Sequence, residues 1–93
     1  NKFAKSLGDD HAKYMSPSHT SRPDQIYFFS NAVLMFIEYK RLGKVATPAQ
    51  ANEHEKLRKR GFTVYVIDNL PDAKRVIQQW HDYATSLTGP RPL

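Results

Sequence analysis

A helix with both ends marked in the sequence lies between two apolar runs, and this arrangement restricts the fold more than any other feature. The three segments are the apolar runs at residues 33–40 and 62–67 and the helix at 48–60. Thr47 and Gln50 fit a capping box at the start of the helix, and Gly61 suits the left-handed cap at its end. The flanking runs have the length and the β-forming composition of buried strands. Two strands joined through a helix favour parallel pairing with a right-handed crossover.

The rest of the sequence extends this unit into a mixed α/β pattern. The further expected segments are a helix in the first ten residues, strands at 11–15 and 25–29, a loop at 16–23 and a helix at 70–87. Gly8 ends the first helix and Asn69 caps the last one. The apolar face of the last helix comprises Ala73, Val76, Ile77, Trp80, Ala84 and Leu87. The run 33–40 begins with continuous apolar residues, which predicts a central strand in a small mixed β-sheet flanked by helices.

Chain length and composition exclude several classes of protein. Ninety-three residues favour a single domain, 1–93, with a core at about 11–87 and a tail at 88–93 that should fray. The absence of cysteine excludes disulfide scaffolds, zinc fingers and thiol nucleophiles. The longest apolar run, 32–37, is far shorter than the roughly 20 residues of a membrane helix, and the first ten residues lack the apolar stretch of a signal peptide. We therefore expect a cytoplasmic protein with no membrane partner.

Positive charge is concentrated in one window of the sequence. Residues 40–60 hold seven basic and two acidic side chains, whereas the remaining residues hold seven of each, so the net charge of +5 comes from this window. Localised positive charge of this kind favours binding of a polyanion such as nucleic acid. The alternative is that these lysines and arginines only solvate one face of a helix.

Two carboxylates and a lysine fall at the ends of two adjacent predicted strands. Glu38 and Lys40 are two residues apart, so their side chains share one face of a strand. A three-residue connection at 30–32 puts Asp24 opposite Glu38, whereas a two-residue connection puts Asp24 opposite Ile37, on the other face. Opposed carboxylates repel unless a cation lies between them. Oxygen ligands of this kind select Mg²⁺ or Mn²⁺.

Each of these motifs alone has an ordinary structural explanation. Glu-x-Lys is common at strand ends, Pro-Asp is a common turn dipeptide, and the capping box already explains Gln50. His54, one turn after Gln50, is expected to be polar or DNA-facing rather than a metal ligand, because no second histidine lies at metal-binding spacing. The sequence indicates no partner for His11, His19 or His81. The conjunction of the acidic pair, the lysine and the basic helix is what favours a functional site.

Two stretches of the chain, RPDQIYF and FIEYKRLGKVATPAQANEHEKLRKRGFTVYVID, resemble the virus-type replication-repair nuclease (VRR-NUC) domain of the PD-(D/E)XK superfamily. The resemblance covers about residues 13–77. Its most specific part is the string E-x-K, a basic loop, T-P-x-Q, then H-x-x-L-R-x-x-G and a hydrophobic strand. Members of that superfamily have a restriction-endonuclease-like core, which agrees with the mixed sheet expected from the residues.

The resemblance implies a role for each matching residue. Asp24 and Glu38 would bind Mg²⁺ or Mn²⁺ together with the backbone carbonyl of Tyr39, Lys40 would be catalytic, and Gln50 would orient Lys40 or the attacking water. This sequence departs from the family pattern in two places. The residues before the Pro-Asp read HTSR without the usual glycine, and no glutamate precedes Glu38. Asp9, Asp10 or a residue beyond this chain are the alternatives for the upstream acidic ligand.

These observations together predict a metal-dependent DNA endonuclease. By the resemblance, we expect a homodimer that cuts branched, flap or Holliday-junction DNA. The expected DNA-binding residues are Arg41, Lys44, His54, Arg58, Lys59 and Arg60. The alternatives are a DNA-binding module without catalysis and a sequence-specific restriction or repair endonuclease.

Overall fold

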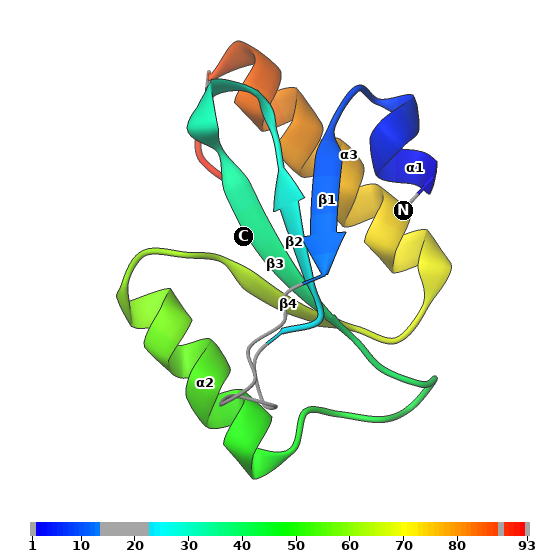
Figure 1. The fold of residues 1–93 in the computed structure, drawn as a ribbon, viewed down its shortest axis with the longest axis vertical. Coiled ribbons are helices and arrows are strands. Elements are labelled where there is room, and N and C mark those ends of the chain that lie inside the picture. Colours follow the sequence, from blue (N-terminus) through cyan, green and yellow to red (C-terminus); the bar gives the residue numbers. More distant parts are fainter. Residues whose placement is uncertain (1, 14–22, 88, 93) are drawn as a thin grey trace.

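The computed structural model describes residues 2–13, 23–87 and 89–92, which form a mixed sheet of four strands with helices on both faces (Figure 1). The strands, in the order of the sheet, are β1 (Asp10–Lys13), β2 (Gln25–Phe28), β3 (Leu34–Tyr39) and β4 (Val64–Ile67). The helices are α1 (Lys2–Ser6), α2 (Pro48–Lys59) and α3 (Leu70–Ser86), and a short 3₁₀ turn, η1, spans Ser30–Ala32. The predicted fold class is confirmed.

β3 is central, as its apolar sequence predicts. It pairs antiparallel with β2 and parallel with β4, and its residues 35–38 are all buried. β4 was expected to be a buried strand, and this holds only for its two end residues. β4 lies at the edge of the sheet, where Val66 is 38% exposed, although Val64 and Ile67 are buried. The apolar sequence of β4 therefore supplies two core side chains, Val64 and Ile67, and favours the extended backbone that pairs with β3.

The hairpin between β2 and β3 closes through a turn with two left-handed residues. Asn31 and Ala32 have φ angles of 61° and 62°, a conformation that asparagine tolerates better than most residues. The Phe29 amide donates a hydrogen bond to the Val33 carbonyl over 2.7 Å, which closes a three-residue connection. Asn31 Nδ2 also donates to the Ala84 carbonyl over 2.7 Å and so attaches the turn to the C-terminal end of α3.

This turn sets the register of the two strands. Gln25 lies opposite Ile37, and each earlier residue of β2 lies opposite a later residue of β3. One further step puts Asp24 in line with Glu38, as a three-residue connection predicts. Because the side-chain period of a strand is two, both carboxylates point to the same face of the sheet.

The two faces of the sheet carry different cores. The face that α3 covers holds the larger one, in which the buried residues include Tyr27, Met35, Ile37, Ile67, Val76, Ile77 and Trp80. The face that α2 covers holds a smaller cluster of Phe36, Leu57 and Val64, with Ile26 and Leu34 packed against it. Figure 1 shows α2 (green) well separated from α3 (yellow to orange). Asp24, Glu38 and Lys40 therefore belong to the face that α2 covers.

The helix ends largely follow their sequence signals. Thr47 and Gln50 form the predicted capping box, and the Asn69 side chain accepts a hydrogen bond from the Asp72 amide at the start of α3. Leu87 is an exception, because it was expected on the buried face of α3. It is instead the left-handed C-cap, with a φ of 51°, and it is half exposed. Among the helices described, none is long and apolar enough to cross a membrane.

An acid–histidine pair joins the N-terminal segment to α3. Asp9 Oδ2 lies 2.9 Å from His81 Nδ1, and the Asp9 side chain is only 2% exposed. The expectation that His81 has no partner is therefore wrong, since residues 72 positions apart give no local signal of pairing. The predicted loop 16–23 falls mainly on residues 14–22, and the predicted fraying tail includes 88 and 93. These residues lie outside the described part of the chain.

Substitution of Asn31 tests whether the turn fixes the hairpin. Asn31→Ala removes the hydrogen bond to Ala84 and puts a less tolerant residue at a positive φ, so unfolding should become easier by about 2 kcal/mol. Asn31→Gly removes the hydrogen bond but accepts the conformation, so its loss should be about half as large. Urea denaturation of the two variants and the wild type measures the difference. Equal stability of Asn31→Ala and wild type would contradict this account of the turn.

Candidate functional site

Asp24 and the end of β3 form the acidic part of the site. Asp24 directly precedes β2, and its Oδ2 accepts a hydrogen bond of 3.2 Å from the backbone amide of Tyr39. In an extended strand the N–H and C=O of one residue point toward the same neighbour, so the Tyr39 carbonyl is directed to the Asp24 side. The Tyr39 side chain points to the opposite face, where its hydroxyl lies 2.6 Å from that of Tyr27. The backbone of Tyr39 thus faces Asp24 while its ring belongs to the core.

Glu38 is buried with an unusual charge environment. Its side chain is 4% exposed, and burial raises the pKa of Glu38 to about 7. The neighbouring Asp24 carboxylate adds to the increase, whereas the Lys40 ammonium opposes it. A carboxyl that gives up its proton near neutral pH, next to a second carboxylate, is a group that a cation would stabilise strongly in its charged form.

Lys40 is held between Glu38 and Gln50. Its Nζ donates a hydrogen bond of 2.5 Å to Gln50 Oε1 and lies 3.7 Å from Glu38 Oε2. Gln50 Oε1 also accepts a 2.9 Å hydrogen bond from the Thr47 amide, as the capping box requires. The capping contact of Gln50 and its contact with Lys40 are therefore compatible, because the same oxygen accepts both hydrogen bonds. The cap fixes the amide oxygen, and the amide oxygen in turn fixes the ammonium group.

His54 lies inside the site and not on the DNA-facing surface. Its side chain is 1% exposed, and its Nε2 lies 3.8 Å from Glu38 Oε1. Burial, and next the positive charges of Arg58 and Lys40, hold the pKa of His54 below its usual value. The prediction that His54 contacts DNA is therefore wrong in this conformation. Its position one turn after Gln50 was the available signal, because a residue four positions along a helix lies on the same side.

The donor set suits a hard cation with few protein ligands. In the described ranges no three side chains of His, Asp or Glu converge as metal ligands. A cation at this position would be bound by the carboxylates of Asp24 and Glu38 and the carbonyl of Tyr39, with water in the other positions. This is the coordination that Mg²⁺ favours, since it binds through one or two carboxylates and retains several waters.

Asp9 and Asp10 lie at the end of the sheet remote from Asp24. The backbone of Asp10 pairs with Phe28, and Asp9 is engaged by His81. Four residues of β2 separate that end from Asp24, which is about 13 Å. Within the described residues, Asp9 is therefore not placed to bind a cation held by Asp24.

The predicted DNA-binding residues separate into two groups. Arg41 and Lys44 are exposed in the connection that follows Lys40, which leaves the sheet at the end where Glu38 lies. Lys59 and Arg60 are exposed at the far end of α2, which is about 15 Å along the helix from Gln50.

Arg58 and Asp68 have structural contacts that the sequence did not indicate. Arg58 Nη2 donates a 2.7 Å hydrogen bond to the Val64 carbonyl, so this guanidinium ties α2 to β4 rather than being freely available to a phosphate. Asp68 Oδ2 accepts a 2.9 Å hydrogen bond from the Gly43 amide, which fixes the exposed connection between β3 and α2. Gly43 has a φ of 79°, which suits glycine in this turn.

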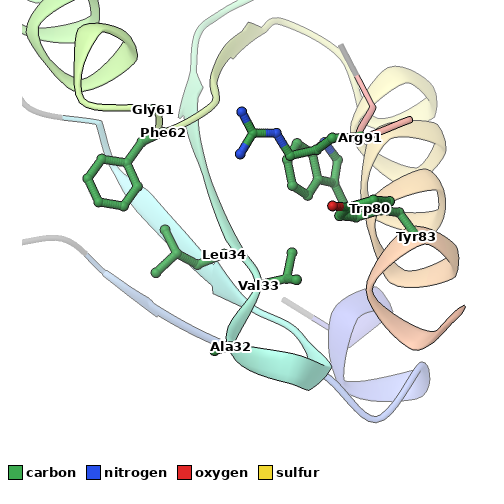
Figure 2. A pocket seen from close by; sticks show the side chains of 8 residues that line it. All are labelled: Ala32, Val33, Leu34, Gly61, Phe62, Trp80, Tyr83 and Arg91. Atoms are coloured by element: carbon green, nitrogen blue, oxygen red, sulfur yellow. The ribbon is translucent and has the colours of Figure 1, made fainter. Parts of the chain in front are cut away.

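Two pockets on the surface of the protein lie away from the acidic site. A pocket of about 220 Å³ lies between the start of β3, Phe62 and α3. Its lining side chains, among them Trp80, Tyr83 and Arg91, are drawn in Figure 2. A second one, of about 560 Å³, borders β4, Arg91 and Pro92. Neither is lined by Asp24, Glu38 or Lys40.

Comparisons with known proteins relate the chain to nucleases. No family model matches the sequence. The "Putative nuclease p44" of Acyrthosiphon pisum secondary endosymbiont phage 1 is 35% identical over 57 residues, which are 61% of this chain and 61% of the phage protein. A solved structure described as a VRR_NUC domain has a TM-score of 0.73 at 28% identity and covers 83% of this chain and 88% of its own. A second, a VRR_NUC domain protein, has a TM-score of 0.60 at 28% identity over 71% of this chain and 57% of its own.

The raised pKa of Glu38 predicts a specific dependence of stability on pH. A carboxyl that binds its proton more tightly in the folded state stabilises the fold below its ordinary pKa of 4.5, and this stabilisation is lost as the pH rises through about 7. Glu38→Gln stays neutral, so in EDTA it should gain stability over the wild type between pH 5 and pH 8, by about 3 kcal/mol at most. Thermal unfolding at both pH values measures this gain.

The comparison uses the difference in melting temperature between the wild type and Glu38→Gln at each pH. The lowered pKa of His54 makes stability rise with pH below 6.5 in both of them, so it largely cancels. A wild type and a Glu38→Gln variant whose melting temperatures change in parallel from pH 5 to pH 8 would show that Glu38 is not buried as described.

Proposed function

Because this chain is a VRR-NUC domain, we propose that it is a metal-dependent nuclease that hydrolyses phosphodiester bonds of DNA. The observation that carries the proposal is the arrangement at one end of the sheet. There Asp24 lies in line with Glu38, and the Lys40 ammonium lies between Glu38 and Gln50. Two carboxylates and one fixed ammonium group provide both a cation site and a positive charge for a phosphate.

The acidic pair would hold the cation. When bound, a divalent ion supplies a Lewis acid that neutralises phosphate charge and lowers the pKa of a water molecule. Asp24 and Glu38 determine where that ion sits, and the Tyr39 amide holds the Asp24 carboxylate in place. A protein without such a cation would gain nothing from burying Glu38 beside a second carboxylate, since burial of a charge destabilises a fold. This favours the enzyme over a DNA-binding module without catalysis.

Lys40 would act on the scissile phosphate. Its ammonium group is fixed before substrate arrives, because Gln50 Oε1 holds it and the capping box holds Gln50. A positive charge fixed in advance stabilises the extra negative charge that develops in the transition state of phosphodiester hydrolysis. Gln50 is accordingly a positioning residue, which acts through Lys40.

The basic surface would bind the DNA backbone in two places. Arg41 and Lys44 lie in the exposed connection that directly follows Lys40, and Lys59 and Arg60 lie at the far end of α2. A duplex is wide enough to contact both groups, and contacts of this kind position DNA without reading its bases. We leave Arg58 out of this set because its guanidinium is bonded to the Val64 carbonyl.

The shape of the DNA substrate is inferred from the resemblance to VRR-NUC domains. On that ground we propose branched or flap DNA, including four-way junctions, as the substrate and a homodimer as the working unit. The matched relative is phage-encoded, and a phage that replicates and recombines its genome produces branched DNA.

Cleavage assays with defined DNA test the metal requirement and the substrate together. Supercoiled plasmid and a four-way junction are each incubated with the protein in Mn²⁺, in Mg²⁺ and in EDTA. We expect cutting with either cation and none in EDTA, and faster cutting of the junction than of a linear duplex of the same sequence. DNA binding without cutting in all three conditions would favour the non-catalytic module.

Substitutions of basic residues separate chemistry from binding. Lys40→Met keeps the apolar stem and removes the charge, so cleavage should fall by orders of magnitude while DNA affinity falls little. The matched control, Lys59→Gln with Arg60→Gln, removes two charges remote from the acidic pair. It should weaken binding and lower its salt slope by about 0.9 per lost phosphate contact, yet cut at a near-normal rate at saturating DNA.

The assignment of Lys40 can be contradicted directly. If Lys40→Met cuts at near wild-type rate when DNA is saturating, the lysine is only another phosphate contact. The nuclease site as drawn would then be wrong.

A further inference from the structure

Two buried polar atoms in the site lack hydrogen-bond partners. Glu38 Oε1 and His54 Nε2 are both shielded from solvent, and neither has a partner among the described residues. They lie 3.8 Å apart, which is beyond hydrogen-bond distance. An unsatisfied buried polar group costs about 1–3 kcal/mol, so the pair destabilises the fold as it stands. A group that lowers stability at a functional site needs an explanation from function.

The surrounding described residues offer Glu38 Oε1 and His54 Nε2 few other hydrogen-bond partners. The other oxygen of Glu38, Oε2, faces Lys40 at 3.7 Å. His54 is carried by α2, which is anchored at its start by the capping box and along its length by the buried Leu57. The helix therefore presents Nε2 to Glu38 from a fixed position. The two atoms are 3.8 Å apart, so a shift of less than about 1 Å would bring them within hydrogen-bond distance.

We propose that His54 is a positioning residue that donates its Nε2–H to Glu38 Oε1 when the site holds its cation. This leaves Oε2 directed toward the cation and Lys40. Either the neutral ring with its proton on Nε2 or the protonated ring can donate at this atom, so the role does not depend on the charge of His54. Carboxylates that bind metals are commonly oriented by hydrogen bonds of this kind, and loss of such a partner lowers metal affinity 10- to 100-fold. The inference rests on the proposed metal-dependent function.

A purely structural histidine would behave differently. If His54 only filled space, a side chain of similar length would replace it without affecting the cation. If it stabilised the fold, any apolar replacement would lower the melting temperature. The proposed role predicts a third pattern, in which removal of the donor weakens the cation site but does not destabilise the cation-free protein, because one unsatisfied polar atom has been removed.

Two substitutions of His54 and one of His81 distinguish these cases. His54→Gln keeps an N–H donor at about the position of Nε2, whereas His54→Met has a similar length and no donor. His81→Leu is the control, because its ring is paired with the buried Asp9 at the other end of the sheet. Mn²⁺ affinity is measured by electron paramagnetic resonance of the free ion, and the melting temperature is measured in EDTA.

We expect His54→Met to bind Mn²⁺ at least tenfold more weakly than wild type, with an unchanged or higher melting temperature. His54→Gln should bind within about threefold of wild type, and His81→Leu should melt lower with unchanged Mn²⁺ affinity. Wild-type affinity in His54→Met, or equal weakening in both His54 variants, would overturn the proposal. If the wild type itself binds no Mn²⁺ at millimolar concentration, the metal-dependent function fails first and this inference fails with it.

Discussion

The register of the β2–β3 hairpin is the constraint on which the rest of the site depends. A strand alternates its side chains between two faces, so a shift of one residue would move Asp24 to the core face, away from Glu38. The register is set by a three-residue turn whose left-handed residues, Asn31 and Ala32, lie at the opposite end of the hairpin. The connection of Asn31 to α3 therefore supports the geometry of an acidic pair several residues away.

Helix α2 covers the face on which that pair lies and supplies the polar groups around it. Its first turn positions Gln50, which holds Lys40, and its second turn carries His54 beside Glu38. Both contacts act on β3, so the parallel strand–helix–strand unit is also the unit that builds the site. Under the proposed function, the orphaned oxygen of the buried Glu38 is explained by a bound cation, and the arrangement lowers stability, as is common at functional sites.

Local signals in the sequence were enough to predict the elements, and contacts between distant residues were not. The caps of α2 and α3 follow from their capping residues, and the central position of β3 follows from its continuous apolar run. The sequence left two hairpin connections open, and the three-residue one in the structure puts Asp24 in line with Glu38. The spacing from Gln50 puts His54 on the same side of α2, but its full burial could not be predicted, because the sequence does not say how closely α2 packs on the sheet. The bond of Arg58 to β4 and the Asp9–His81 pair join segments that only the fold brings together.

If the register brings Asp24 and the end of β3 together around one cation, bound Mn²⁺ will broaden the nuclear magnetic resonance signals of nearby residues. In amide correlation spectra at substoichiometric Mn²⁺, the signals of Gln25, Tyr39 and Lys40 should lose intensity first and those of η1 last. Asp24→Asn should abolish this pattern. Broadening that begins instead at exposed carboxylates of α3, such as Asp72 and Asp82, would show that the cation does not bind between Asp24 and β3.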